Sequence, residues 1–239
     1  MSNVRECGKA VQRALALGFL LCLGTLGHRT LAQAPASPTR PLVEVRTDLG
    51  RMVLALYNET PLHRDNFLKL VRTNAYDSLL FHRVVPGFMA QGGDPESKHA
   101  GADVTLGNGG PGYSLPAEVV QGLVHKKGAI GAARQGEDAR SISHSNGSQF
   151  YVVEGKTYNA ADLDQVAQRN ARFGTPTSWT EEQKQQYAIV GGAPHLDGAY
   201  TVFGEVVEGI EVLDALSTQA CDARDRPLKD IRMFMRVLE

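Results

Sequence analysis

The stretch Phe81-His82-Arg83-Val84-Val85-Pro86-Gly87-Phe88-Met89-Ala90-Gln91-Gly92-Gly93-Asp94 carries the clearest structural signal in this chain of 239 residues. It contains two short apolar runs joined by a Pro-Gly turn, which is typical of neighbouring strands. Similar runs recur at 129–133, 150–153, 201–207 and 231–237, and an alternating pair lies at 42–47 and 51–56. Many short strands with frequent glycine turns predict a mainly β, closed antiparallel barrel.

Only two or three helices accompany these strands. Thr60 is a candidate N-cap before Pro61, and Phe67, Leu70 and Val71 follow at helical spacing. Residues 209–216 suggest a second short helix. Residues 158–194 are polar and helix-prone, so we predict a helical insertion in a surface loop, with helices at 161–172 and 181–190. Ser178-x-x-Glu181 resembles a capping box for the second of these helices.

The N-terminus has the pattern of a secretory signal peptide. Arg5, Lys9 and Arg13 precede an uncharged segment at 14–27, which is shorter than the roughly 20 residues that span a bilayer. We predict a signal peptide at 1–34, a proline-containing linker at 35–41 and one domain at 42–239. A cut after Ala32 and an uncleaved anchor remain alternatives. The protein is therefore expected to be periplasmic or secreted.

Charge and cysteine content narrow the possible partners. Residues 1–34 hold four basic residues and one acidic residue, so the mature chain has 21 basic and 25 acidic residues, or a net charge of −4. This balance does not favour nucleic acid, nor a membrane surface after signal cleavage. Cys221 is the one cysteine after residue 34, so no internal disulfide is expected. We expect a monomer.

Three blocks carry a family resemblance. Residues 81–94 resemble the signature segment of cyclophilins, Asn146-Gly147-Ser148-Gln149-Phe150-Tyr151 resembles the strand that follows in that family, and Leu196-Asp197-Gly198 with Val202-Phe203-Gly204 resembles the next. The resemblance covers about 42–237. It implies an eight-stranded antiparallel barrel capped by two helices, a ligand groove on the outer barrel surface, and peptidyl-prolyl cis/trans isomerase activity without metal or cofactor.

The chemistry of X-Pro isomerisation suits the residues in these blocks. Amide resonance gives a barrier of roughly 18–20 kcal/mol, and no covalent bond is made or broken, so the enzyme must bind the twisted amide better than either planar form. The resemblance assigns that task to Arg83, with Gln91 as the second catalytic residue, orienting Arg83 together with Gln149. The implied substrate-binding residues are Phe88, Met89, Ala133, Arg134, Gln149, Tyr151, His195, Leu196 and Tyr200.

Some features depart from the family pattern. His195 and Tyr200 stand where many eukaryotic members carry Trp and His, and Arg134 replaces a frequent Asn. Residues 135–145 form a longer loop than in compact members, and the 158–194 insertion enters just before His195, as a lid over the groove or as decoration. We interpret the glycine-rich segment 107–112 as a turn beside the groove, because it lacks the Lys-Ser/Thr of a phosphate loop.

Two other functions compete with an isomerase acting on X-Pro segments of unfolded or exported proteins. A proline-peptide-binding chaperone module would use the same groove with little turnover, but it would not need the Arg83 cation. A hydrolase is disfavoured because the sequence has no G-x-S-x-G nucleophile elbow.

Overall fold

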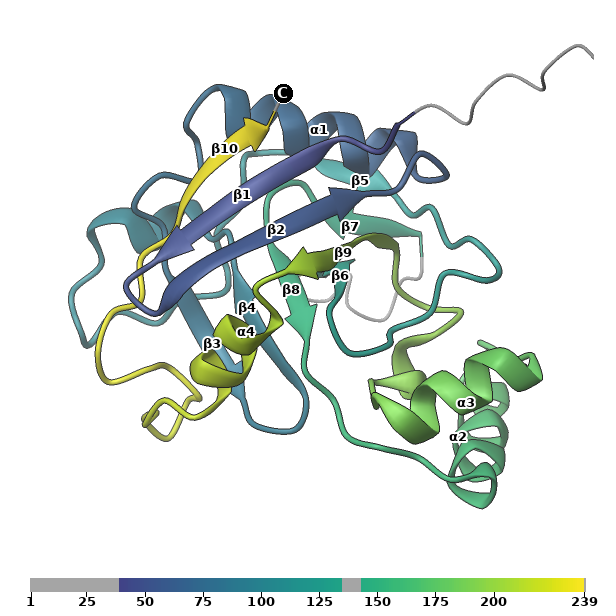
Figure 1. The fold of residues 1–239 in the computed structure, drawn as a ribbon. Coiled ribbons are helices and arrows are strands. Elements are labelled where there is room, and N and C mark those ends of the chain that lie inside the picture. Colours follow the sequence, from purple (N-terminus) through teal and green to yellow (C-terminus); the bar gives the residue numbers. More distant parts are fainter. Residues whose placement is uncertain (1–38, 135–142, 239) are drawn as a thin grey trace, which may run out of the picture. The chain divides into compact units, whose positions relative to one another are not determined.

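The computed structural model describes residues 39–134 and 143–238; the expected signal peptide, part of the linker and most of the 135–145 loop lie outside these ranges. The eight strands of the main sheet are all antiparallel to their neighbours, as predicted (Figure 1). Their order is β10 (Phe234–Leu238), β1 (Leu42–Thr47), β2 (Gly50–Leu56), β9 (Val202–Glu208), β6 (Ala129–Ala132), β8 (Phe150–Val153), β4 (Met89–Gly92) and β3 (Phe81–Val85). A separate two-stranded sheet pairs β5 (Ser114–Pro116) with β7 (His144–Asn146).

The two ends of the curled sheet meet through the segment before β10. The sequence predicted a strand over 231–237, but residues 231–233 do not continue β10. They pair with the residues that lead into β3: Ser78 donates its N–H to Met233, Met233 donates to Leu79, and Phe81 donates to Ile231, at 2.8–3.0 Å. These bonds satisfy the edge that an open sheet would leave exposed.

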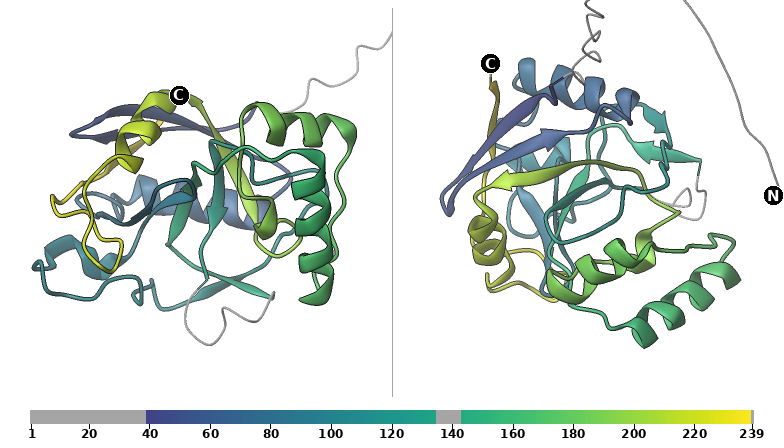
Figure 2. Two further views of the ribbon diagram at one scale, coloured as in Figure 1. Left: turned by 90° about the horizontal axis from the view of Figure 1, so that it is seen from below. Right: turned by 45° about the vertical axis from the view of Figure 1, so that its right-hand side comes forward.

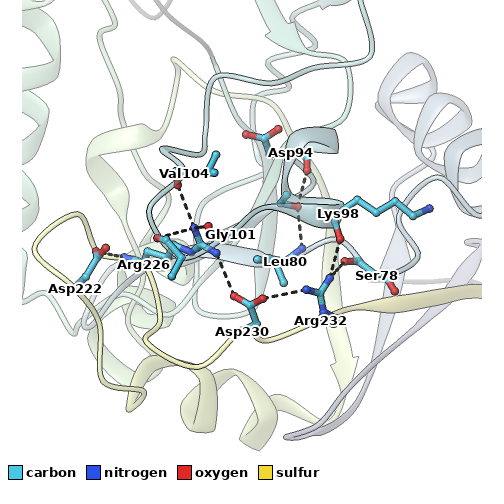
Figure 3. Close-up of polar contacts among 12 residues, drawn as sticks. Ser78, Leu80, Asp94, Lys98, Gly101, Val104, Asp222, Arg226, Asp230 and Arg232 are labelled. Carbon is cyan, nitrogen blue, oxygen red and sulfur yellow. Dashed lines mark hydrogen bonds and ion pairs between the residues drawn. The ribbon is translucent and has the colours of Figure 1, made fainter.

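Two arginines anchor the same C-terminal segment to the loop after β4, as Figure 3 shows. Arg226 donates to the carbonyl oxygens of Gly101, Ala102 and Val104 at 2.9–3.2 Å. Arg232 donates to those of Ser78 and Lys98. Asp230 accepts from both guanidinium groups. The network fixes the chain before β3, the strand that carries Arg83, and after β4.

Side chains alternate between the two faces of the sheet and build two separate apolar clusters. On β8, Phe150 and Val152 belong to the interior core, whereas Tyr151 and Val153 belong to the second cluster. The interior core also holds Phe67, Leu68 and Val71 of α1 (Pro61–Arg72) and Val212, Leu213 and Leu216 of α4 (Ile210–Ser217). The two expected capping helices therefore close the barrel core, and the second cluster lies on the outer surface.

Helix α1 begins where the sequence predicts, but its N-terminus is capped differently. Thr60 occupies the N-cap position without a side-chain capping bond. Glu118 instead accepts from the backbone N–H groups of Leu62 and His63, at 3.0 and 2.9 Å, and from Nδ1 of His63 at 2.6 Å. A carboxylate distant in sequence thus satisfies the free N–H groups of this helix.

The predicted insertion forms two helices, α2 (Ala160–Arg172) and α3 (Glu181–Ile189), which lie together at the side of the barrel (Figure 2). The expected capping box at Ser178 and Glu181 is wrong: Thr180 caps α3 and pairs with Gln183. Asn159 and Asp162 form the capping box of α2. Within the described ranges, no helix is long and apolar enough to cross a membrane.

Candidate active site

Four strands bring Arg83, Gln91, Tyr151 and Gly131 into one row across the outer face of the sheet. Arg83 on β3 lies opposite Gln91 on β4, Gln91 lies opposite Tyr151 on β8, and Tyr151 lies opposite Gly131 on β6. Directly opposite residues in antiparallel strands share a face, so all four side-chain positions point outward. The expected cation therefore lies beside the expected pocket.

The outer apolar cluster gathers most of the residues expected to hold the proline ring. Met89, Ala133, Tyr151 and Leu196 are buried within it, and Phe88 and Tyr200 pack against it partly exposed. Leu196 comes from η3 (Pro194–Leu196), a single 3₁₀ turn after the insertion. Such a cluster on the outside of a barrel is an apolar surface that a small ring can occupy.

A close approach at Gly131 sets the position of the Tyr151 ring. A Cβ atom added at Gly131 would lie 2.2 Å from Cζ of Tyr151 and 2.4 Å from its hydroxyl oxygen. The ring therefore lies directly on the backbone of β6, where only glycine leaves room for it. Gly131 was not among the expected site residues, because its role depends on a neighbour in another strand.

Arg83 is partly exposed and forms an ion pair that the sequence did not predict. Its Nε lies 3.3 Å from Oδ2 of Asp225. Asp225 lies in the loop between α4 and β10 with a φ of 65°, and its carbonyl oxygen accepts from Val84 at 2.8 Å. The ion pair occupies one edge of the guanidinium and leaves the terminal nitrogens to face a ligand.

The two glutamines of the site bond to each other rather than to Arg83. Gln91 Nε2 donates to Oε1 of Gln149 at 2.9 Å, and Gln149 Nε2 donates to the carbonyl oxygens of Gly107 and Gly109 at 3.0 and 2.7 Å. The structure shows no hydrogen bond from Gln91 or Gln149 to Arg83 among the described residues, so the expected orienting contact is replaced by Asp225.

The glycine-rich turn at 107–112 borders the groove, as the sequence suggested. Asp94, fully buried, holds it by accepting from the N–H groups of Gly107 and Gly109 at 2.6 and 3.2 Å. Beside it lies a cavity of about 230 Å³ lined by Arg83, Gln91 and His82, among other residues. His82 is buried, and burial lowers its pKa to about 4, so this ring is neutral near pH 7.

The remaining expected residues form the rim of the pocket. The His195 ring lies 5.3 Å from that of Phe88, and the Tyr200 ring meets the Tyr151 ring edge-on at 6.2 Å. The Arg134 guanidinium lies over Tyr200, 4.3 Å from the ring centre, and burial lowers its pKa. Every residue expected at the site therefore lies on this face or packs against it.

The described residues contain no group of three or more His, Cys, Asp or Glu side chains that could hold a metal ion. What the site offers is a fixed cation beside an apolar pocket and several amide dipoles. It can hold a cyclic apolar group and stabilise charge on an adjacent amide without covalent chemistry.

Comparison with known proteins identifies the family. The family model described as cyclophilin type peptidyl-prolyl cis-trans isomerase/CLD matches residues 42–236. This chain belongs to the cyclophilin family of peptidyl-prolyl cis-trans isomerases. The cyclophilin resemblance of the three sequence blocks is thereby confirmed.

Two bacterial relatives support the assignment. A protein from Staphylococcus haemolyticus that is inferred to be a peptidyl-prolyl cis-trans isomerase is 30% identical over 79% of this chain and 86% of its own length. An inferred bifunctional phosphatase/peptidyl-prolyl cis-trans isomerase from Streptococcus pyogenes is 34% identical over 81% of this chain, which spans 37% of that longer protein.

Solved structures show the same fold. A cyclophilin-type isomerase from Cryptosporidium parvum matches 84% of this chain and 98% of its own, with a TM-score of 0.60 and 23% identity. A second structure of the same Cryptosporidium protein was obtained in the presence of the dipeptide Ala-Pro, and it matches with a TM-score of 0.58 and 22% identity.

Proposed function

We propose that this isomerase acts on X-Pro segments of exported, unfolded polypeptides, with Arg83 stabilising the twisted amide. The observation that carries this proposal is the cross-strand row that sets Arg83 beside Tyr151 and the outer apolar cluster. The Ala-Pro dipeptide present with the Cryptosporidium cyclophilin supports a proline-containing ligand.

The proposed mechanism is differential binding. When the X-Pro amide twists, the proline nitrogen recovers its lone pair, and a donor aimed at that nitrogen favours the twisted form over both planar forms. A guanidinium offers a delocalised cation with several donors, and Asp225 holds the Nε edge of Arg83. An acceleration of about 10⁵ requires roughly 7 kcal/mol of such selective stabilisation.

The apolar cluster and the glutamines have separate tasks in this mechanism. Met89, Tyr151 and Leu196 hold the proline ring, so that rotation occurs on the other side of the amide bond. Gln149 is buried and bonded to the carbonyl oxygens of Gly107 and Gly109, and it holds Gln91, which presents its amide group to the substrate backbone. Groups that are already oriented lose little entropy when the substrate binds.

The first test measures cis-to-trans relaxation of an X-Pro peptide by the purified protein and by Arg83→Ala. We expect the wild type to accelerate relaxation and the variant to lose about 10²-fold in kcat/KM, the usual cost of removing one stabilising donor. Peptide binding should persist in the variant, because the apolar pocket is intact. Absence of acceleration by the folded wild type would contradict the enzyme assignment, and a groove that binds proline peptides without turnover would then be the remaining function.

The export part of the proposal rests on the sequence of residues 1–34 alone. We expect the protein to be recovered from the periplasm or the medium with a mature N-terminus at Gln33 or Pro35, which N-terminal sequencing of the native protein would determine. Recovery of the protein in the cytoplasm with residues 1–34 attached would contradict export and leave the isomerase proposal unaffected.

A further inference from the structure

The insertion is connected to the apolar pocket through one buried carboxylate. Asp197 follows Leu196 directly and is almost fully buried. Its Oδ2 accepts from two insertion residues, Nε1 of Trp179 at 2.7 Å and the hydroxyl of Tyr187 at 2.5 Å. Its Oδ1 accepts from the backbone N–H of His125 at 2.9 Å and from Nδ1 of the same residue at 2.7 Å.

The connection continues from His125 to the pocket wall. A carboxylate only accepts hydrogen bonds, so Nδ1 of His125 carries the proton that binds Asp197, and this fixes the orientation of the ring. Nε2 then pairs with the Tyr151 hydroxyl at 2.9 Å, and the two rings are stacked with 15° between their planes. The Tyr151 hydroxyl is therefore engaged behind the pocket, and the ring face is what a ligand meets.

The insertion is itself well packed against this segment. Tyr187 and Leu163 are fully buried, and the Trp179 ring meets the Tyr187 ring edge-on at 6.1 Å. Asn170 donates to the carbonyl oxygen of Pro194 at 3.4 Å, in the same 3₁₀ turn that carries Leu196. Ala193 donates its N–H to the carbonyl oxygen of His125 at 2.7 Å.

We propose that the insertion at 158–194 sets the shape of the proline pocket, with Trp179 and Tyr187 as positioning residues that act through Asp197. Trp179 and Tyr187 both donate to Oδ2 of Asp197. Oδ1 of Asp197 accepts from His125, which in turn pairs with the Tyr151 hydroxyl. The same carboxylate fixes the backbone next to Leu196. Two pocket residues, Leu196 and Tyr151, thus depend on contacts made by Trp179 and Tyr187 of the insertion. This inference rests on the proposed function of the outer pocket.

A buried carboxylate also needs donors for stability alone, so the experiment must separate the two roles. Tyr187→Phe removes only the hydroxyl donor, and Trp179→Phe removes the indole N–H while leaving a smaller aromatic ring; both are made singly and together. The matched control is Tyr158→Phe, which removes a hydroxyl from the same insertion with no hydrogen bond to Asp197. Kinetics and thermal unfolding are measured for all variants.

We expect the double variant to remain folded and to lose roughly 10-fold in kcat/KM, mainly through KM, because the pocket wall loses its fixed position. Tyr158→Phe should match the wild type. Adding Tyr151→Phe to the double variant should cost less than Tyr151→Phe costs in the wild type, because both changes interrupt one chain of contacts. If Tyr151→Phe costs the same factor in kcat/KM in both backgrounds, or if the double variant is as active as the wild type, the inference is overturned.

Trp179 is the only tryptophan of the chain, so its fluorescence provides a test without catalysis. Titration with an X-Pro peptide should change the Trp179 emission in the wild type, and the change should shrink in Tyr151→Phe. A wild type that binds the peptide, shown by calorimetry, with unaltered emission would contradict the coupling. A wild type without isomerase activity would contradict the proposed function, and the emission change would still decide the coupling.

Discussion

Asp225 forms an ion pair with Arg83, although it lies outside the signature segment at 81–94. It lies in a loop far along the chain and adopts a left-handed φ that Asn tolerates as well, so Asp225→Asn removes the charge with little backbone strain. Exposed ion pairs contribute about 0.2–1 kcal/mol, so we expect kcat/KM to fall up to about fivefold as the guanidinium becomes mobile. The measurement is the peptide relaxation rate.

Measuring Asp225→Asn in the Arg83→Ala background distinguishes positioning of Arg83 from a general effect of the substitution. In Arg83→Ala, the change Asp225→Asn should cost nothing further, because Asp225 acts on the site only through that guanidinium. An equal loss in both backgrounds would show that Asp225 acts by another route.

Gly131 tests how closely the Tyr151 ring must lie on β6. Gly131→Ala places a methyl group 2.2 Å from Tyr151 Cζ, so the ring must move into the pocket. We expect a loss of about 1–3 kcal/mol in the free energy of unfolding from overpacking, and at least about a 10-fold loss in kcat/KM. Gly101→Ala is the control, because nothing lies within 4 Å of its added Cβ. Full activity in Gly131→Ala would show that the ring position is not critical.

Helix α1 depends on Glu118 for its N-terminal cap. Glu118→Ala removes three contacts to Leu62 and His63. Loss of a capping side chain costs about 0.5–2 kcal/mol, and the His63 ring that loses its partner adds about 1 kcal/mol. We expect the free energy of unfolding to fall by about 2–3 kcal/mol, with faster amide exchange in the first turn of α1. Chemical denaturation with Glu59→Ala as a neighbouring exposed control measures this. Equal stability of the two variants would contradict the capping role.

The caps also show which parts of the elements can be predicted from sequence. Apolar periodicity places α1 and the strands of residues 42–56 correctly, and the helix-prone composition of 158–194 places α2, because these signals are local. Thr60, Ser178 and Thr180 all have the chemistry of a cap, and only tertiary contacts decide among them. Glu118 caps α1 in place of Thr60. Helix α3 starts at Glu181 as predicted, but its cap is Thr180 rather than Ser178.

The site residues also divide into those that a local sequence pattern predicts and those that only tertiary contacts bring together. Arg83, Gln91, Met89 and Phe88 lie in one continuous signature, so a resemblance finds them together. Asp225, Gly131 and the His125–Asp197 pair are assembled from separate segments, and their roles arise only when β3, β6 and η3 are neighbours. Contacts between distant segments leave no spacing pattern in a single sequence.

In the whole molecule, one sheet serves two purposes because its faces are chemically independent. The inner face and two helices make the core that supplies stability, and the outer face carries the pocket. A barrel filled by its own side chains leaves no interior site, so a ligand must bind outside. The insertion then adds a second layer behind the pocket, where Asp197 meets Trp179 and Tyr187. Rigid support from both sides suits an enzyme that must distinguish a twisted amide from a planar one.

Buried histidines make the whole fold sensitive to acid. Burial lowers the pKa of His82 from 6.5 to about 4, and it lowers the pKa of His63 as well. Between pH 6.5 and about 4, the unfolded chain binds a proton at His82 that the folded chain does not bind. The free energy of unfolding therefore falls as pH drops through this window. A shift of this size corresponds to at most about 3 kcal/mol.

The measurement is the free energy of unfolding by urea at pH 7, 6, 5 and 4, for the wild type and for His82→Gln. We expect the variant to lose less stability than the wild type between pH 6.5 and 4, because Gln does not titrate. Glu44, whose pKa is lowered from 4.5 to about 2 by hydrogen bonds from Arg236 and Arg51, stays ionised in the folded protein through this window. Its contribution to stability is complete above about pH 4.5 and is lost as pH falls from there towards 2. Parallel curves for the two proteins would show that His82 is not the group responsible, and His63, held by Glu118, would then be the next to replace.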